Sequence, residues 1–286
     1  EGVRGKRSVE WGLVDEAPPK AKLEEVTKRR VEALVANAKR KPFPAMKLPP
    51  LEAKRSPEKI EYQYVTLELS PKARTARLVV KAPTSKQPET PEELAKAGAS
   101  AWAVQAFREL DDALLELRFN QPNIGVVSVE TSGDPKSVLA VDAMLAKHAS
   151  DGLVREVVLH MKRVLKRFDL TAKSFFALIV PGSAFAGSLF ELALASDRIY
   201  MKDSDEAEAS VATSPLNAGL LPMATGLSRL QTRFLREPER VSRVLEAGPL
   251  STPEANKAGL VTFAPDDIDW DDEIRIAFEE RAAMSP

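Results

Sequence analysis

Apolar residues recur at helical spacing in three parts of the chain, and this spacing predicts its main helices. The three segments are 21–40, a stretch within 92–118, and 152–169. The last is strongly amphipathic, with lysines and arginines opposite its leucines and valines. His160 lies within it and is interpreted as a structural residue at the edge of the core.

Alternating and continuous apolar runs predict the strands. Alternation over 62–69 and 75–82, on either side of a polar turn, predicts a hairpin. Apolar runs at 124–131 and 174–180 predict buried strands, and 198–203 predicts a short strand. Because helices alternate with these strands, we expect an α/β fold with right-handed crossovers.

A proline-rich stretch separates the first predicted helix from the strands. Prolines cannot continue a helix, and here they are Pro42, Pro44, Pro49, Pro50 and Pro57. We therefore expect an extended linker over 42–58 and the main domain boundary of the chain at this place.

Composition excludes several classes of function. The chain has 286 residues, with 41 lysines and arginines against 42 acidic residues, so no basic field favours nucleic acid. It has no cysteine and 2 histidines, which excludes disulfides and argues against a cysteine or imidazole metal site. No run approaches the roughly 20 apolar residues of a membrane span. We expect a cytoplasmic protein with no metal, no nucleic-acid partner and no membrane partner.

The segment 175–201 carries the most specific candidate chemistry. Gly182 and Gly187 lie between a predicted strand and the next helix, where the backbone turns sharply. The first N–H groups of a helix have no partner within it, so the Ser188 amide could bind a developing negative charge. Glu191 follows in an apolar run, where burial would raise its pKa toward a value useful to an acid or base. The alternative is a partly exposed glutamate in the first helical turn.

Three motifs, in this order, resemble those of the crotonase (enoyl-CoA hydratase/isomerase) superfamily. They are PGSAFAGSLFELALASD at 181–197, GLLPMATGLSRL at 219–230 and LSTPEANKAGLVTFAP at 250–265. The resemblance implies an α/β fold with a crotonase-like ββα spiral core and a C-terminal helical segment. It also implies that Glu191 is catalytic, and that the backbone N–H groups of Leu139 and Ser188 are oxyanion donors for an acyl-CoA thioester.

Two departures from the family pattern affect this chemistry. LAVD at 139–142 stands where the family has A-G-A-D, without the glycine. Residues 214–217, SPLN, stand in the region of the family's second catalytic glutamate and contain no carboxylate. Hydration by a pair of carboxylates is therefore not expected from Glu191 alone.

Within the superfamily, residues 101–135 and 155–198 resemble the benzoyl-CoA-dihydrodiol lyase family, also described as epoxybenzoyl-CoA dihydrolases. Proteins of that family carry two crotonase-like halves, and the resemblance is to the C-terminal half. It implies a lyase of aerobic benzoate degradation that opens ring-epoxidised benzoyl-CoA with water and releases formate. Coenzyme A enters as the substrate thioester, so no separate cofactor is expected.

The chain repeats one phrase near its two ends. GLVDEAPP at 12–19 and GLVTFAPD at 259–266 share five of their first seven positions, by chance or by internal repetition. The two-unit resemblance explains the match, since each phrase would close one unit. We thus interpret 1–41 as the tail and last helix of a preceding unit, 59–265 as the second domain and 266–286 as its C-terminal helix.

Three functions follow from these interpretations. The second unit could share in the lyase site through Glu191, or it could be a scaffold that completes the fold and a homo-oligomer, with 274–284 suited to subunit contacts. An ordinary enoyl-CoA hydratase or isomerase is the third. The missing second carboxylate favours the scaffold for this half alone, with the catalytic pair expected in the absent N-terminal unit.

Overall fold

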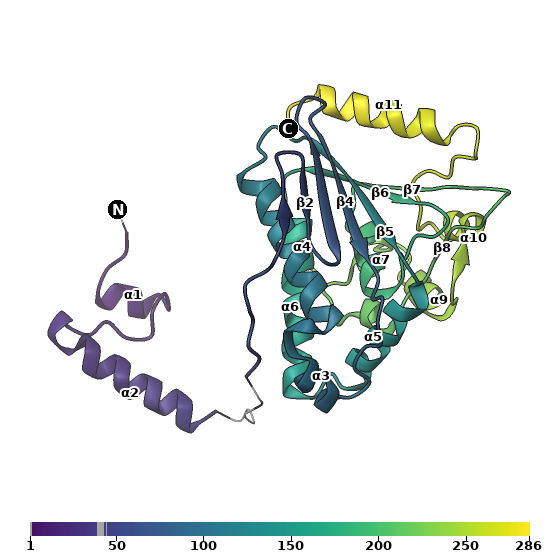
Figure 1. Cartoon of the computed structure of the whole chain (residues 1–286). Helices are drawn as coiled ribbons and strands as arrows, with labels where there is room; N and C mark the ends of the chain where they lie inside the picture. The colour runs from purple at the N-terminus through teal and green to yellow at the C-terminus, as the bar shows by residue number, and fades with distance from the viewer. Residues whose placement is uncertain (1, 39–42, 44) are drawn as a thin grey trace. The chain divides into compact units, whose positions relative to one another are not determined.

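A computed structural model describes the chain except for residues 1, 39–42 and 44, and divides it into two compact units. The first is Glu1–Pro42 and the second is Phe43–Pro286. Figure 1 shows both units, and each is described here by itself. No helix among the described residues is long and apolar enough to cross a membrane.

The first unit consists of α1 (Lys6–Glu10), η1 (Lys20–Lys22) and α2 (Leu23–Ala36). The helix predicted over 21–40 is present as α2, while 39 and 40 lie outside the described residues. Its apolar side chains do not pack against a core: Leu34 and Val35 are 72% and 69% exposed. This unit therefore presents apolar surface that its own residues do not cover.

The repeated phrases adopt the same local structure. In each, a glycine with positive φ stands two residues beyond the end of a short helix, with φ +67° at Gly12 and +77° at Gly259. A 14-residue helix follows, α2 in one copy and α11 (Trp270–Ala283) in the other. Their burial differs, because Leu13 is 62% exposed and Leu260 is 1% exposed.

The second unit is built on a seven-stranded sheet in which neighbouring strands are consecutive in the sequence. Pairing is antiparallel from β1 to β4 and parallel from β4 to β7. The predicted hairpin and the three later strands are confirmed. The strands are β1 (Lys54–Arg55), β2 (Lys59–Glu61), β3 (Val65–Ser70), β4 (Thr75–Lys81), β5 (Val126–Ser132), β6 (Ser174–Ile179) and β7 (Arg198–Met201).

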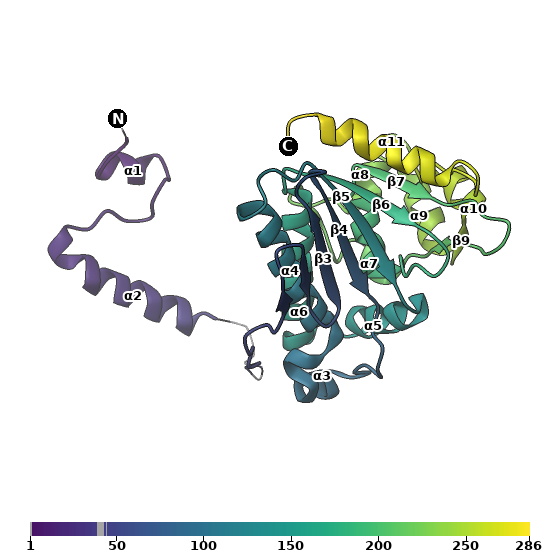
Figure 2. The same ribbon diagram turned by 45° about the horizontal axis from the view of Figure 1, so that its top comes forward.

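Helices cover both faces of this sheet. On one face α4 (Trp102–Phe119) and α6 (Gly152–Asp169) lie side by side and enclose the largest core (Figure 1). On the other face α11 packs Trp270 and Ala277 against Phe176 and Tyr200, and Figure 2 shows it lying across the strands. The C-terminal helix expected within 266–286 is thus present and contributes to the core of its own domain.

The sequence analysis did not predict several helices, of which α5 is the longest, and it merged two others. Asp134 accepts a hydrogen bond from the Lys136 amide and begins α5 (Pro135–Lys147), which the apolar pattern did not reveal. Gly98, with φ +57°, separates α3 (Pro91–Ala97) from α4. The remaining elements are η2 (Gly98–Ser100), α7 (Gly187–Leu194), β8 (Ser210–Val211), η3 (Pro215–Ala218), α8 (Arg229–Arg233), α9 (Glu239–Glu246), β9 (Leu250–Ser251) and α10 (Thr252–Lys257).

Both edges of the sheet are protected against further pairing. At one edge β1 is two residues long, and both of its side chains, Lys54 and Arg55, are exposed cations. At the other edge the segment after α10 runs along β7. The Thr262 amide donates a hydrogen bond to the Ile199 carbonyl, and the Met201 amide donates one to the Phe263 carbonyl. The described part of the predicted linker is extended, and Met46 and Leu51 pack on the main core.

The core on α6 yields a stability prediction. Leu165 is fully buried and Leu159, on the same helix, is 44% exposed. Leu165→Ala should lower the free energy of unfolding by about 2–5 kcal/mol, because it removes buried methyl groups and leaves a cavity. Leu159→Ala, the matched control, should change it by less than about 0.5 kcal/mol. Urea denaturation of both variants measures this, and equal effects would contradict the assigned orientation of α6.

Candidate active site

The candidate site lies where β6 leads into α7. Gly187, the first residue of α7, has φ +49°, a backbone conformation that residues other than glycine rarely adopt. A Cβ atom built on Gly187 would lie 2.0 Å from the Asp142 carboxylate. The glycine is therefore required both by the turn and by the close approach of this acidic side chain.

The start of α7 is occupied by a carboxylate of the chain itself. Oδ2 of Asp142 accepts hydrogen bonds from the Ser188 amide, at 2.6 Å, and from the Ser214 hydroxyl, at 2.8 Å. Asp142 is fully buried, and burial raises the pKa of its carboxyl group to about 7. Its other oxygen, Oδ1, has no hydrogen-bond partner among the described residues. The N–H group predicted to bind an oxyanion thus binds Asp142.

The resemblance implied that the backbone N–H of Leu139 is an oxyanion donor, which requires that N–H to be free. Leu139 lies inside α5, where helix geometry directs its N–H toward the carbonyl of Pro135. α5 packs against α7, but the α5 side chain that reaches the Ser188 amide is that of Asp142. The structure does bring Ser188 and Glu191 onto one helix, α7.

Glu191 is buried in a network of charges. It is 1% exposed, so the alternative of a partly exposed glutamate is wrong. Its Oε2 pairs with Nη1 of Arg229 at 2.8 Å, and its Oε1 accepts from the Asn217 amide group at 2.6 Å. Burial raises the pKa of Glu191, while Arg229 and Asn217 oppose that shift. Arg229 also binds both carboxylate oxygens of Asp169.

Residues 214–217, which stand where the resemblance places a second catalytic glutamate, hold the two buried carboxylates. Ser214 binds Asp142, and Asn217 binds Glu191 and the carbonyl of Gly187. The side-chain oxygen of Asn217, Oδ1, in turn accepts a hydrogen bond from the Ser214 backbone amide at 2.7 Å. All the side chains of this short segment that could hydrogen bond therefore face the protein interior.

Sequence reasoning identified Glu191 but not the residues that surround it. Arg229 was recognised only as part of a motif, and Asp142 only as the end of LAVD. Asp169, the last residue of α6, carried no signal. A requirement for a cation near a buried glutamate could have pointed to Arg229, since buried charges are usually paired.

The arginine between two carboxylates yields a second stability prediction. Arg229→Met should lower the free energy of unfolding by about 3–5 kcal/mol, because it leaves the buried Glu191 without a cation and removes the partner of Asp169. Arg275→Met is the control, since Arg275 makes its two ion pairs on the exposed surface of α11 and should change stability little. Thermal unfolding of both variants measures the difference. Similar melting temperatures would show that the buried network contributes nothing.

Asp142 yields a prediction about pH. An unfolded aspartate titrates near pH 3.9 and the folded one near pH 7, so between these values the folded state holds a proton that the unfolded state has released. The stability contribution of that proton is lost as the pH rises through 7. Asp142→Asn cannot titrate at this position. Its free energy of unfolding minus that of the wild type should therefore be about 2–3 kcal/mol larger at pH 8 than at pH 5. Urea denaturation at several pH values tests this, and a difference that does not vary with pH would refute it.

Comparisons with known proteins agree with the fold and with the resemblance. The chain is 42% identical over 290 residues to benzoyl-CoA-dihydrodiol lyase of Aromatoleum evansii, which covers 100% of this chain and 52% of that protein. The chain therefore spans about half the length of this curated relative. No family model matches.

Solved structures show the same fold at low sequence identity. An enoyl-CoA hydratase from Geobacillus kaustophilus is 18% identical with a TM-score of 0.53, over 78% of this chain and 76% of that one. An enoyl-CoA hydratase/carnitine racemase from Magnetospirillum magneticum is 17% identical with a TM-score of 0.53, over 80% and 78%. The predicted crotonase-like α/β fold is thus confirmed, and the chain is similar along its whole length to one half of a benzoyl-CoA-dihydrodiol lyase.

Proposed function

We propose that residues 43–286 form a non-catalytic half of a two-unit enzyme of the benzoyl-CoA-dihydrodiol lyase type. The whole enzyme would open ring-epoxidised benzoyl-CoA with water and release formate, and coenzyme A would enter as part of the substrate thioester. The 42% identity to such a lyase supports the whole-enzyme activity. The catalytic carboxylate pair would belong to the other crotonase-like unit.

The bond from the Ser188 amide to Asp142 is the observation that carries this proposal. An oxyanion donor must have its N–H free to donate a hydrogen bond to the negative charge that develops on the substrate oxygen. Here the donor is already 2.6 Å from a carboxylate oxygen, and Ser188 and Asp142 are both fully buried. A thioester carbonyl would have to displace the Asp142 side chain before the Ser188 amide could polarise it.

The environment of Glu191 supports the same conclusion. A general acid or base must reach the proton that it transfers. Each oxygen of Glu191 is instead bound by a protein donor, Arg229 at one and Asn217 at the other. The side chain is also 1% exposed, so this glutamate acts in our proposal as an internal counter-ion that joins α7 to α8.

The first unit has a role that follows from its exposed apolar surface. In the second unit, the equivalent helix α11 covers the sheet with Trp270 and Ala277. The local structure of α1 and α2 repeats that of α10 and α11, but the apolar side chains of α2 are exposed. In this proposal α2 covers the sheet of the other crotonase-like unit in the same way.

Titration calorimetry with benzoyl-CoA tests the proposal. The chain should show no binding at millimolar ligand, and neither Glu191→Gln nor Asp142→Asn should change that result. Free coenzyme A serves as the control for contacts outside the acyl pocket, and circular dichroism checks that each variant is folded.

Three outcomes would reject the non-catalytic assignment. One is micromolar binding of benzoyl-CoA that weakens at least tenfold in Glu191→Gln. Another is addition of water to an enoyl-CoA by the chain, which would favour an ordinary hydratase. The third is release of formate from epoxidised benzoyl-CoA by this chain alone, which would assign the lyase chemistry to this half.

A further inference from the structure

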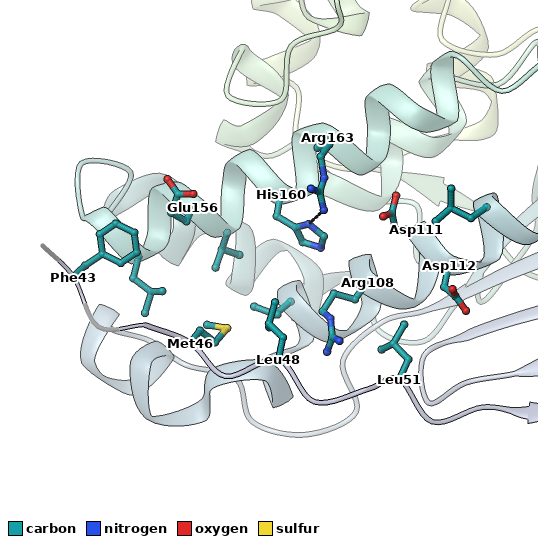
Figure 3. Close-up of a pocket in the computed structure, with 14 residues that line it drawn as sticks. Phe43, Met46, Leu48, Leu51, Arg108, Asp111, Asp112, Glu156, His160 and Arg163 are labelled. Carbon is teal, nitrogen blue, oxygen red and sulfur yellow. Dashed lines mark hydrogen bonds between the residues drawn. The ribbon is translucent and has the colours of Figure 1, made fainter. Parts of the chain in front are cut away.

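A cavity lies away from the Glu191 network. It is about 370 Å³ in volume, is open on one side, and is lined by α4, α6 and side chains of Phe43, Met46, Leu48 and Leu51 (Figure 3). None of the residues that line it belongs to the groups around Glu191 or Asp142. Its walls are largely apolar and include Met46, Leu48, Leu51, Val104, Leu115, Leu153 and Val157.

Arg108 brings an unused hydrogen-bond donor to this cavity. One end of its guanidinium group, Nη2, donates to the Pro49 carbonyl at 2.6 Å and so holds the extended segment against α4. The other end, Nη1, is buried and has no hydrogen-bond partner among the described residues. An unpaired buried donor is costly, and more so when it is charged.

His160 brings a second unused donor. Its Nδ1 lies 3.3 Å from Nη2 of Arg163, and since a guanidinium only donates, Nδ1 must accept (Figure 3). Burial and the nearby positive charges of Arg163 and Arg108 lower the pKa of His160, so the neutral ring carries its hydrogen on Nε2. This Nε2 is buried and, within the part of the chain that the structure describes, has no acceptor.

Positive charge is in excess around the Arg108 and His160 donors of the cavity. Asp111 pairs with Arg167 at 2.5 Å, and Asp112 pairs with Arg55 at 2.8 Å. Arg108 and Arg163 form no ion pair with any described residue. Glu156, the third carboxylate of the lining, lies toward the Phe43 end of the cavity (Figure 3).

We propose that this cavity binds a small apolar monocarboxylate. One carboxylate group offers acceptors to both Arg108 Nη1 and His160 Nε2, and its negative charge offsets the two arginines. The apolar body of the ligand then lies against Met46, Leu48 and Val157. A cavity of about 370 Å³ falls within the usual range of small-molecule sites, roughly 300–1,000 Å³.

Three probes of matched shape or charge test the proposal on the full chain. Benzoate has both the ring and the charge, benzamide has the ring alone, and acetate has the charge alone. Proton NMR can follow the titrations, because the chain has only 2 histidines and His148, outside the cavity lining, is the internal control. Benzoate should shift the His160 ring signals and bind at least tenfold more tightly than benzamide or acetate.

Variants locate the site. Arg108→Met and His160→Phe should each weaken benzoate binding at least fivefold, whereas Arg118→Met, on the exposed surface of α4, should change it less than twofold. Melting temperatures check that the variants fold. No binding of benzoate at about 10 mM, tenfold above a millimolar dissociation constant, would overturn the proposal. So would equal binding of benzamide, or binding that His160→Phe leaves unchanged.

Discussion

The buried hydrogen bond between the Ser188 amide and the Asp142 carboxylate determines how the centre of the second unit is arranged. The N-terminus of α7 carries a partial positive charge and unpaired N–H groups, so it attracts a negative group. Here that group comes from α5, and the approach is possible because Gly187 has no side chain. The Ser214 hydroxyl completes the arrangement, which joins α5, α7 and η3.

A second set of charges extends this arrangement to the other helices. Arg229, at the start of α8, binds Glu191 on α7 and Asp169 at the end of α6. Arg229 and Glu191 are buried and the Asp169 side chain is 9% exposed, so each depends on the others for its charge to be compensated. α5, α6, α7 and α8 therefore meet at these polar contacts, next to the Ser188 amide that the resemblance implied as an oxyanion donor.

The sequence predicted the elements whose signals are local. The amphipathic pattern of α6 predicted its bounds, 152–169, and alternation predicted the β3–β4 hairpin. α5 escaped because its apolar spacing is less regular and because LAVD was interpreted through the family motif. Its N-terminal signal, Asp134 followed by Pro135, was present in the sequence, since an aspartate cap and a proline at the first helical position are typical helix starts.

The candidate site was less predictable because its contacts are distant in sequence. Burial of Glu191 could be inferred from its apolar neighbours, but its partner Arg229 lies 38 residues further along. Asp142 lies 46 residues before Ser188, and no periodicity relates the two. Such pairs form only when the sheet brings α5, α7 and α8 together, so their recognition required the three-dimensional structure.

The protected edges of the sheet limit how this domain can associate with other chains. Joining two sheets edge to edge requires a free row of backbone N–H and C=O groups. β1 offers only two residues, both with exposed cationic side chains, and β7 already pairs with the segment after α10. Strand addition is therefore disfavoured at the β1 edge and blocked by existing pairing at the β7 edge, so helix surfaces and side chains are the favoured sites for recognition of a partner. Misassembly into extended β-structure is disfavoured by the same geometry.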